Sequence, residues 1–151
     1  MIREITHVGL TVSDLDRSIK FYKDVLGLKF QGEILMEGEQ TDKLFAKENV
    51  KARVAYLNGS DEVFAPPIEL IQFVGEEPIE HKCDLNKCSI SEICFRVENI
   101  DKFYKKLVDK NVECLSEPQD FDFTNQGFGK SKAIYFKDPD GIILELMEYI
   151  D

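Results

Sequence analysis

The sequence predicts an α+β fold made of two βαβββ modules. Three observations carry this prediction: one pattern occurs twice, apolar and polar residues alternate in short runs as in strands, and a helix-type run follows the first strand of each half. The repeat aligns residues 6–16 with residues 91–101, and residues 68–71 with residues 144–147. The matching positions carry histidine or glutamate: His7 with Glu92, and Glu69 with Glu145.

The first half reads as a strand, a helix and three further strands. Alternation predicts a strand over 5–12, and apolar residues then recur at helical spacing after Asp14. We therefore expect a helix over 15–26 that ends at Gly27. The remaining expected elements are strands over 29–36, 52–57 and 67–74, with a charged stretch over 37–51.

The second half repeats this order. A strand over 90–97 leads to a helix over 100–110, and a second strand is expected near 112–116. A long loop over 118–130 follows. The last two strands are expected over 132–136 and 142–149, joined by an Asp-Pro-Asp-Gly turn. The domain organisation that follows is module one over 1–74, a linker over 75–87 and module two over 88–151.

Alternation also assigns faces, because residues two apart in a strand point to the same side of a sheet. His7 falls on the face opposite Val8 and Leu10, and the same parity separates Glu69, Glu92 and Glu145 from their apolar neighbours. We therefore expect an open, barrel-like curved sheet around a central cavity. The helices should cover its apolar face, and the polar residues should line its concave face.

Composition narrows the classes of partner and location. A formal net charge of −10 argues against nucleic acids and anionic membranes. The sequence shows no signal peptide and no long apolar run, which favours a cytoplasmic protein with reduced cysteines.

Cys83, Cys88 and His81 could suggest a small zinc site, but the spacing lacks paired CxxC motifs and a fourth ligand. We interpret that segment as a polar linker.

The four repeated positions suggest a metal site. Taken singly, a histidine on a strand is usually structural, and a glutamate near a strand end is usually solvated. Their repeat-equivalent placement favours a shared role for His7, Glu69, Glu92 and Glu145. Three carboxylates in one pocket raise each other's pKa, and a divalent cation holds them ionised. Oxygen-rich donors with one imidazole suit manganese, iron(II), cobalt, nickel or zinc.

Two arginines are weaker candidates for binding substrate. Arg96 follows Glu92 with the same parity, and Arg53 lies in a strand of the first module. Either could bind an anion in the cavity. An exposed arginine, or one paired with a carboxylate, is the alternative for both.

Two motifs carry a resemblance to a known family. They are His7-Val8-Gly9-Leu10-Thr11-Val12 near the start and Lys137-Asp138-Pro139-Asp140-Gly141 before Leu144-Glu145-Leu146 near the end. The chain resembles the vicinal oxygen chelate superfamily, which comprises glyoxalases, bleomycin-resistance proteins and dioxygenases. Within it, the chain looks most like lactoylglutathione lyases (glyoxalase I) and methylmalonyl-CoA epimerases. The resemblance implies two βαβββ modules around one divalent metal ion, often in a homodimer.

The resemblance also implies site residues and a reaction. The family's metal positions fall on His7, Glu69, Glu92 and Glu145, although the two enzyme groups named keep a histidine where this chain has Glu92. The implied reaction is removal of a proton next to a carbonyl, with a metal-stabilised enediolate. Glu145 is the expected base and Glu69 the second acid/base. The expected substrate is a small 2-oxo or hydroxy-carbonyl compound, free or conjugated to a thiol.

Other activities of the same family stay open. A small-molecule-binding protein of the bleomycin-resistance kind needs no complete ligand set. An extradiol dioxygenase needs two histidines and a carboxylate on iron(II), whereas the second histidine of this chain, His81, falls in the linker. Thiol transfer of the fosfomycin-resistance type also expects a second histidine. The four retained donors favour the lyase or isomerase.

Overall fold

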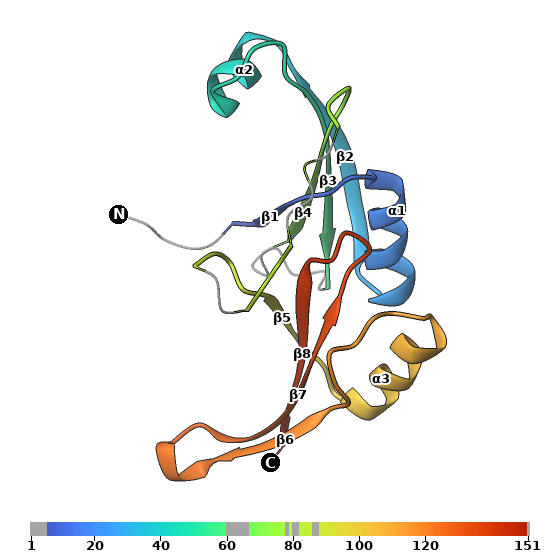
Figure 1. Cartoon of the computed structure of the whole chain (residues 1–151), viewed down its shortest axis with the longest axis vertical. Helices are drawn as coiled ribbons and strands as arrows, with labels where there is room; N and C mark the ends of the chain where they lie inside the picture. Colours follow the sequence, from blue (N-terminus) through green and yellow to red (C-terminus); the bar gives the residue numbers. More distant parts are fainter. Residues whose placement is uncertain (1–5, 60–66, 78, 80–81, 86–87, 151) are drawn as a thin grey trace. The chain divides into compact units, whose positions relative to one another are not determined.

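The structure is a computed structural model that describes residues 6–59, 67–77, 79, 82–85 and 88–150. The chain divides into two compact units, Met1–Glu80 and His81–Asp151, and the boundary falls within the predicted linker. Each unit contains one open four-stranded mixed sheet with helices (Figure 1). The predicted α+β fold class is confirmed. The barrel-like arrangement of both modules around a central cavity stays a prediction.

The first unit has the strand order β1-β4-β3-β2. The outer strand β1 runs parallel to β4, and the other neighbours are antiparallel. The order of strands along the sheet is therefore that of a βαβββ module. The elements are β1 (Val8–Thr11), α1 (Leu15–Lys20), the π-helical turn η1 (Phe21–Val25), β2 (Lys29–Glu37), α2 (Glu39–Phe45), β3 (Lys51–Asn58) and β4 (Ile68–Phe73).

The second unit repeats this topology as β5-β8-β7-β6. Here β5 runs parallel to β8, and the remaining pairs are antiparallel. The repeat in the sequence is thus a repeat of the sheet. The elements are β5 (Ile93–Arg96), α3 (Ile100–Asp109), β6 (Gln119–Phe123), the 3-10 turn η2 (Thr124–Gln126), β7 (Gly129–Lys137) and β8 (Ile143–Ile150).

The helix of each unit begins at the polar residue that the sequence offers as a cap. The Asp14 side chain accepts a hydrogen bond from the Arg17 amide, and the Asn99 side chain accepts one from the Lys102 amide. Each cap satisfies an amide that the first helical turn leaves unpaired. The first helix continues through η1 and ends at Gly27, whose φ of 81° suits glycine.

Equivalent polar contacts hold both helices on their sheets. Gln72 of β4 accepts a hydrogen bond from the Leu15 amide at 3.2 Å, and Glu148 of β8 accepts one from the Ile100 amide at 3.0 Å. Gln72 also donates to the Ser13 carbonyl oxygen at 3.0 Å. Because Leu15 and Ile100 are fully buried, these contacts fix the position of each helix start beside the core.

Two elements differ from the sequence prediction. The charged stretch 37–51 contains helix α2, which begins after Gly38 and places Phe45 against a cluster around Val54. The strand predicted near 112–116 is wrong, since this segment forms only an isolated bridge from Cys114 to Phe136. The strand that follows helix α3 in this unit is instead β6, which lies inside the predicted loop 118–130. All five of its residues are exposed, so it lacks the half-buried pattern that identifies a strand.

The polar contact at the helix start gives a stability prediction. Gln72→Ala should lower the free energy of unfolding by about 1–2 kcal/mol, because it leaves two partly buried backbone groups without their partner. Urea unfolding measures the change. Gln126→Ala, on an exposed turn, is the control and should leave stability unchanged within about 0.5 kcal/mol. Equal stability of the two variants would contradict this account of helix docking.

Candidate functional site

The candidate site of the first unit is a row of residues across neighbouring strands. The sheet register pairs Glu69 of β4 with Gly9 of β1 on one side and with Tyr56 of β3 on the other. Glu69 is buried, with 9% of its surface exposed. His7, just before β1, brings its Nε2 to 3.5 Å from Oε2 of Glu69 and its ring edge-on to Tyr56. The structure therefore brings together the two residues that the sequence predicts for this unit.

Tyr56 holds the Glu69 carboxylate by a hydrogen bond. The phenol O–H donates to Glu69, and this bond, together with burial and the carboxylate charge, raises the pKa of Tyr56 to about 12. Tyr56 therefore keeps its proton at neutral pH and remains a donor. Glu69 thus interacts with the phenol of Tyr56 and lies near an imidazole nitrogen of His7.

The second unit contains the equivalent row. Here the register pairs Glu145 of β8 with Cys94 of β5 and with Tyr135 of β7. Glu145 is buried, with 8% of its surface exposed, whereas the thiol of Cys94 beside it is exposed. Glu92, just before β5, lies close enough for its charge to act on Glu145. Cys94 occupies the place that Gly9 leaves without a side chain in the first unit.

Burial and negative charge change the acidity of this second row. Burial, and then the charge of Glu92, raise the pKa of Glu145, while the Cys94 hydrogen bond opposes the shift. Burial, the hydrogen bond to Glu145 and the charges of Glu145 and Glu92 raise the pKa of Cys94 to about 12. Burial and the same charges raise the pKa of Tyr135. The surroundings of Glu145, Cys94 and Tyr135 thus disfavour additional negative charge.

Sequence reasoning missed Tyr56, Tyr135 and Cys94. Each lies on the sheet face that alternation assigns to the predicted metal ligands. This shared face is the signal in the sequence that could have identified them. Parity alone does not say which residues stand side by side. The structure supplies this information as the register of the central strands.

The donors present suit a divalent cation. An imidazole nitrogen and carboxylate oxygens are accepted ligands of first-row metals. The repulsion between Glu92 and Glu145 is of the kind that a cation relieves. Within either unit, however, the described residues contain no group of three or more histidine, cysteine, aspartate or glutamate side chains placed to hold a metal. Each unit offers a pair of donors, and a four-residue site stays a prediction.

The two arginines occupy different faces of their sheets. Arg53 lies on the face that the helix covers, where its guanidinium contacts Asp16 of α1 at 2.8 Å and Glu33 of β2 at 2.7 Å. These two ion pairs hold α1 and β2 against the strand that carries Arg53. Arg96 is exposed and shares a face with Cys94, with its guanidinium 5.4 Å from the ring centre of Tyr149.

An apolar wall adjoins the first row on the same sheet face. Val54 of β3 and Ile71 of β4 are register partners, and each lies two residues from a member of the row, Tyr56 or Glu69. Phe45 of α2 packs against this group. A polar row beside an apolar wall is the arrangement expected of a small-molecule site. The cluster consists of Val50, Ala52 and Val54 with Met36, Phe45, Tyr56, Ile71 and Phe73 around it.

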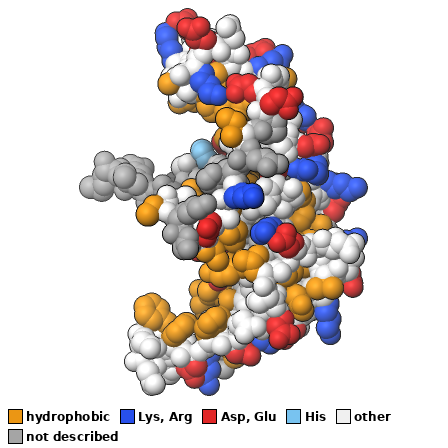
Figure 2. All heavy atoms as spheres, in the orientation of Figure 1, with side chains coloured by type: hydrophobic (Ala, Val, Ile, Leu, Met, Phe, Trp, Pro, Cys, Tyr) orange, Lys and Arg blue, Asp and Glu red, His pale blue; other side chains and the backbone are white. Residues whose placement is uncertain are grey.

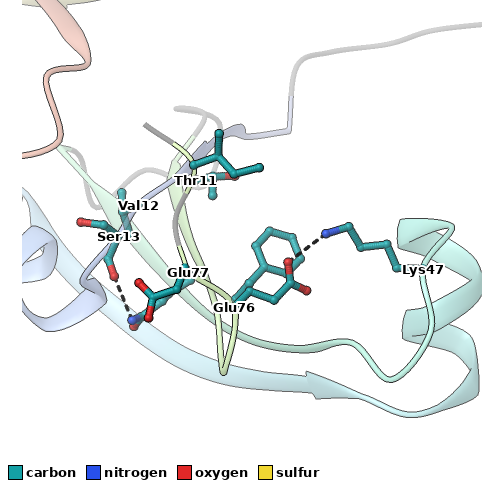
Figure 3. Close-up of a pocket in the computed structure, with 9 residues that line it drawn as sticks. Thr11, Val12, Ser13, Lys47, Glu76 and Glu77 are labelled. Carbon is teal, nitrogen blue, oxygen red and sulfur yellow. Dashed lines mark hydrogen bonds and ion pairs between the residues drawn. The ribbon is translucent and has the colours of Figure 1, made fainter. Parts of the chain in front are cut away.

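A separate cavity of about 210 Å³ lies at the C-terminal ends of the parallel strands β1 and β4 (Figure 3). Lys47 and Glu76 form an ion pair of 3.0 Å at its edge, and Thr11 and Ser13 contribute hydroxyl groups. Phe73 lies four positions beyond Glu69 in β4, a span of about 13 Å in a strand. This cavity is therefore distinct from the row around Glu69.

The hairpin of β6 and β7 exposes aromatic side chains. Phe121 and Phe123 stack with ring centres 5.7 Å apart, and both are more than 40% exposed, as is Phe128 beyond them. Hydrophobic side chains gather at this end of the second unit in Figure 2.

Among the described residues, no helix has the length and apolar character needed to cross a membrane. Cys83 and Cys88, in and beside the predicted linker, are free thiols, and His81 lies outside the described residues.

The raised pKa of Glu145 predicts how metal-free protein responds to pH. The folded state binds a proton at Glu145 more tightly than the unfolded state does, so ionisation of this group costs stability as pH rises. Glu145→Gln should therefore unfold at higher urea concentration than wild type at pH 7.5 in a chelator. The difference should narrow as pH falls toward the ordinary glutamate pKa of 4.5. A variant that is less stable than wild type at pH 7.5 would contradict this sign.

Comparison with known proteins identifies the family. The sequence model of the glyoxalase/bleomycin resistance protein/dioxygenase superfamily matches residues 4–146. The chain is 30% identical over 147 residues to the uncharacterized protein YaeR of Escherichia coli, covering 97% of each. It is 30% identical over 148 residues to the metallothiol transferase FosB of Staphylococcus saprophyticus, covering 97% of this chain and 77% of that one.

Two further comparisons concern part of the chain and the fold. Lactoylglutathione lyase of Haemophilus influenzae is 38% identical over 78 residues, about half of each chain (52% and 50%). A crystal structure of a glyoxalase family protein from Bacillus cereus superposes with a TM-score of 0.86 at 22% identity, covering 100% of this chain and 97% of that one. The chain therefore belongs to the glyoxalase/bleomycin resistance protein/dioxygenase superfamily.

Proposed function

We propose that this protein is a metal-dependent lyase or isomerase of the glyoxalase I type. Its substrate would be a small 2-oxo or hydroxy-carbonyl compound, free or carried on a thiol. The observation that carries the proposal is the duplicated row, in which a buried carboxylate lies between two register partners and near a donor that directly precedes the first strand of the unit. A buried carboxylate is costly without a partner, so two of them at equivalent places favour a functional role.

The residues that would hold the metal are the repeated pairs. His7 and Glu69 would donate from the first unit, and Glu92 and Glu145 from the second. A divalent ion, when bound, supplies positive charge that polarises substrate oxygens and stabilises negative charge developing on them. Zinc, nickel, cobalt, manganese and iron(II) are all compatible with these donors.

Proton transfer is the task that we assign to the two buried carboxylates. Glu145 would remove the proton from the carbon next to the carbonyl and return it to the neighbouring carbon, so the isomerisation conserves all atoms. Burial and the charge of Glu92 raise the pKa of Glu145, which makes its carboxylate a stronger base than an exposed one. Glu69, hydrogen-bonded by Tyr56, would serve as the second acid/base.

The surroundings support a small organic substrate. The apolar wall around Val54 and Ile71 offers a place for a carbon chain beside the carboxylate of Glu69. Such a wall also lowers the local dielectric constant, which strengthens interactions of charged groups with the substrate. A small organic substrate agrees with the small-molecule chemistry of the family. The homodimer and the cytoplasmic location expected from sequence stay predictions.

Transfer of a thiol to an electrophile is the second candidate reaction. The similarity to metallothiol transferase FosB extends over 97% of this chain, further than the similarity to lactoylglutathione lyase. The two reactions differ in a measurable way. A lyase or isomerase converts a hemithioacetal, which is in equilibrium with free thiol and aldehyde, into a thioester, whereas a transferase joins a free thiol to an electrophile that is not an aldehyde.

Metal content tests the donor assignment. Protein purified without chelators should contain about one divalent ion for each complete set of four donors, measured by elemental analysis. The double variant His7→Ala/Glu145→Ala should lose this metal while its circular dichroism spectrum stays unchanged. Wild type that takes up none of the five candidate metals on reconstitution would contradict the donor assignment and favour a metal-free binding protein.

Activity tests the acid/base assignment. Glu145→Gln should lower kcat on a 2-oxoaldehyde hemithioacetal by about 10² to 10⁴, because the amide cannot accept the proton. Glu69→Gln should lower it as well, and Glu98→Gln, at an exposed site, should not. The same variants are assayed for loss of free thiol with an electrophile that forms no hemithioacetal. Full isomerase activity in both Glu145→Gln and Glu69→Gln would refute the assignment.

A further inference from the structure

A cation lies on the site face of the second sheet without a carboxylate partner. Arg96 of β5 is the register partner of Met147 of β8, two positions beyond Glu145. It therefore shares the face of the Glu145 row, opposite to the face on which Glu148 holds the start of helix α3. Among the residues that the structure describes, no carboxylate forms an ion pair with Arg96. Its guanidinium is thus available to bind an anion.

An aromatic ring holds the Arg96 guanidinium. Its central carbon lies over the ring of Tyr149, 5.4 Å from the ring centre. A guanidinium stacked on a ring keeps the N–H groups at its edge free to donate. Because Tyr149 lies two positions beyond Met147 in β8, the Arg96 side chain leans away from Glu145. The positive charge is therefore placed roughly 7–13 Å from the level of Glu145 along the sheet.

The first unit contains a similar arrangement in which the charge is neutralised. Phe73 occupies in β4 the position that Tyr149 occupies in β8, four residues beyond the buried glutamate. The Lys47 ammonium lies 4.9 Å from the ring centre of Phe73, and it forms an ion pair of 3.0 Å with Glu76. Both units thus place a cation over this aromatic ring. The unpaired charge of Arg96 is therefore a property of the second unit that the fold itself does not require.

We propose that Arg96 is a specificity-determining residue that binds a carboxylate at the end of the substrate remote from the reacting carbonyl. This inference rests on the proposed function, because it names the substrate class of the site around Glu145. A planar carboxylate matches the fork of a guanidinium and can accept two parallel hydrogen bonds from it. The spacing also keeps this anion away from the negative charges of Glu92 and Glu145. The substrate would thus be a 2-oxo or hydroxy-carbonyl compound whose thiol or carbon chain ends in a carboxylate.

Binding at Arg96 can be measured without metal or turnover. Hexanoate is titrated into protein carrying ¹⁵N-labelled arginine, and the side-chain Nε–H signals are followed by nuclear magnetic resonance, with Arg96→Met identifying the Arg96 signal. Hexanoate should half-saturate this signal at a concentration about tenfold lower than that for Arg17, an exposed arginine of α1. Arg53, which already contacts two carboxylates, should not respond. Hexanamide, which has the same length without the charge, should shift none of them.

The titration has two outcomes that overturn the proposal. One is an equal response of Arg96 and Arg17 to hexanoate, which would make Arg96 an ordinary surface arginine. The other is an equal response of Arg96 to hexanoate and hexanamide, which would show that the negative charge is not recognised.

Turnover tests whether this anion site selects the substrate. Two hemithioacetals of methylglyoxal, formed with ω-mercaptohexanoate and with ω-mercaptohexanamide, differ only in the remote end group. Metal-loaded wild type should show a kcat/KM about tenfold higher for the carboxylate, through a lower KM. Arg96→Met should lose this preference, and Arg96→Lys should keep part of it, because lysine retains the charge without the fork. Lys105→Met removes one positive charge from the exposed surface of α3 and should keep the preference.

The outcomes separate this inference from the proposed function. A preference that is lost in Arg96→Met and kept in Lys105→Met supports the carboxylate site. Turnover of both conjugates without a preference, or a preference that survives in Arg96→Met, overturns the site and leaves the proposed function intact. Turnover of neither conjugate counts against the proposed function. Selective binding of hexanoate at Arg96 would then still support the carboxylate site, and its absence would overturn it.

Discussion

The site depends on one constraint, the placement of a glutamate in a central strand on the face that the helix does not cover. Glu69 and Glu145 both lie in the strand between an outer parallel strand and an antiparallel neighbour, so each has a register partner on either side. Their charged groups are removed from most of the solvent and need donors or cations in compensation. The residues beside them, Tyr56 and Cys94, meet part of that need.

The opposite face of each sheet keeps this geometry fixed. There the helix start is held by Gln72 in one unit and by Glu148 in the other, next to fully buried leucine and isoleucine side chains. One ion pair in each unit also joins the helix to the sheet, since Arg53 contacts Asp16 and Lys132 contacts Asp101 at equivalent positions. Both faces of each sheet are therefore specified by polar residues, with structural contacts on one side and candidate chemistry on the other.

The sequence was sufficient to predict the repeated strand order, the helices after the first strands and the sheet face of Glu69 and Glu145. It succeeded where the face of a residue follows from parity, while the role of the four repeated donors stays a prediction. It failed at β6, because exposure of both faces removes the pattern that marks a strand. It also could not select Tyr56 or Cys94, because the register between strands depends on turns and on irregularities such as the bulge near Gly32. Arg53 was a weak candidate for binding an anionic substrate, and the alternative of an arginine paired with carboxylates is what the structure shows, with Asp16 and Glu33.

The most direct test of the metal site is a nuclear magnetic resonance titration of protein carrying ¹³C-labelled glutamate carboxyl groups with manganese(II). The paramagnetic ion broadens the signals of carboxylates that it contacts at concentrations far below one equivalent. We predict that Glu69, Glu92 and Glu145 broaden together, while exposed glutamates such as Glu98 and Glu117 stay sharp. Broadening confined to one unit, or spread evenly over exposed glutamates, would contradict a metal site built from the repeated donors.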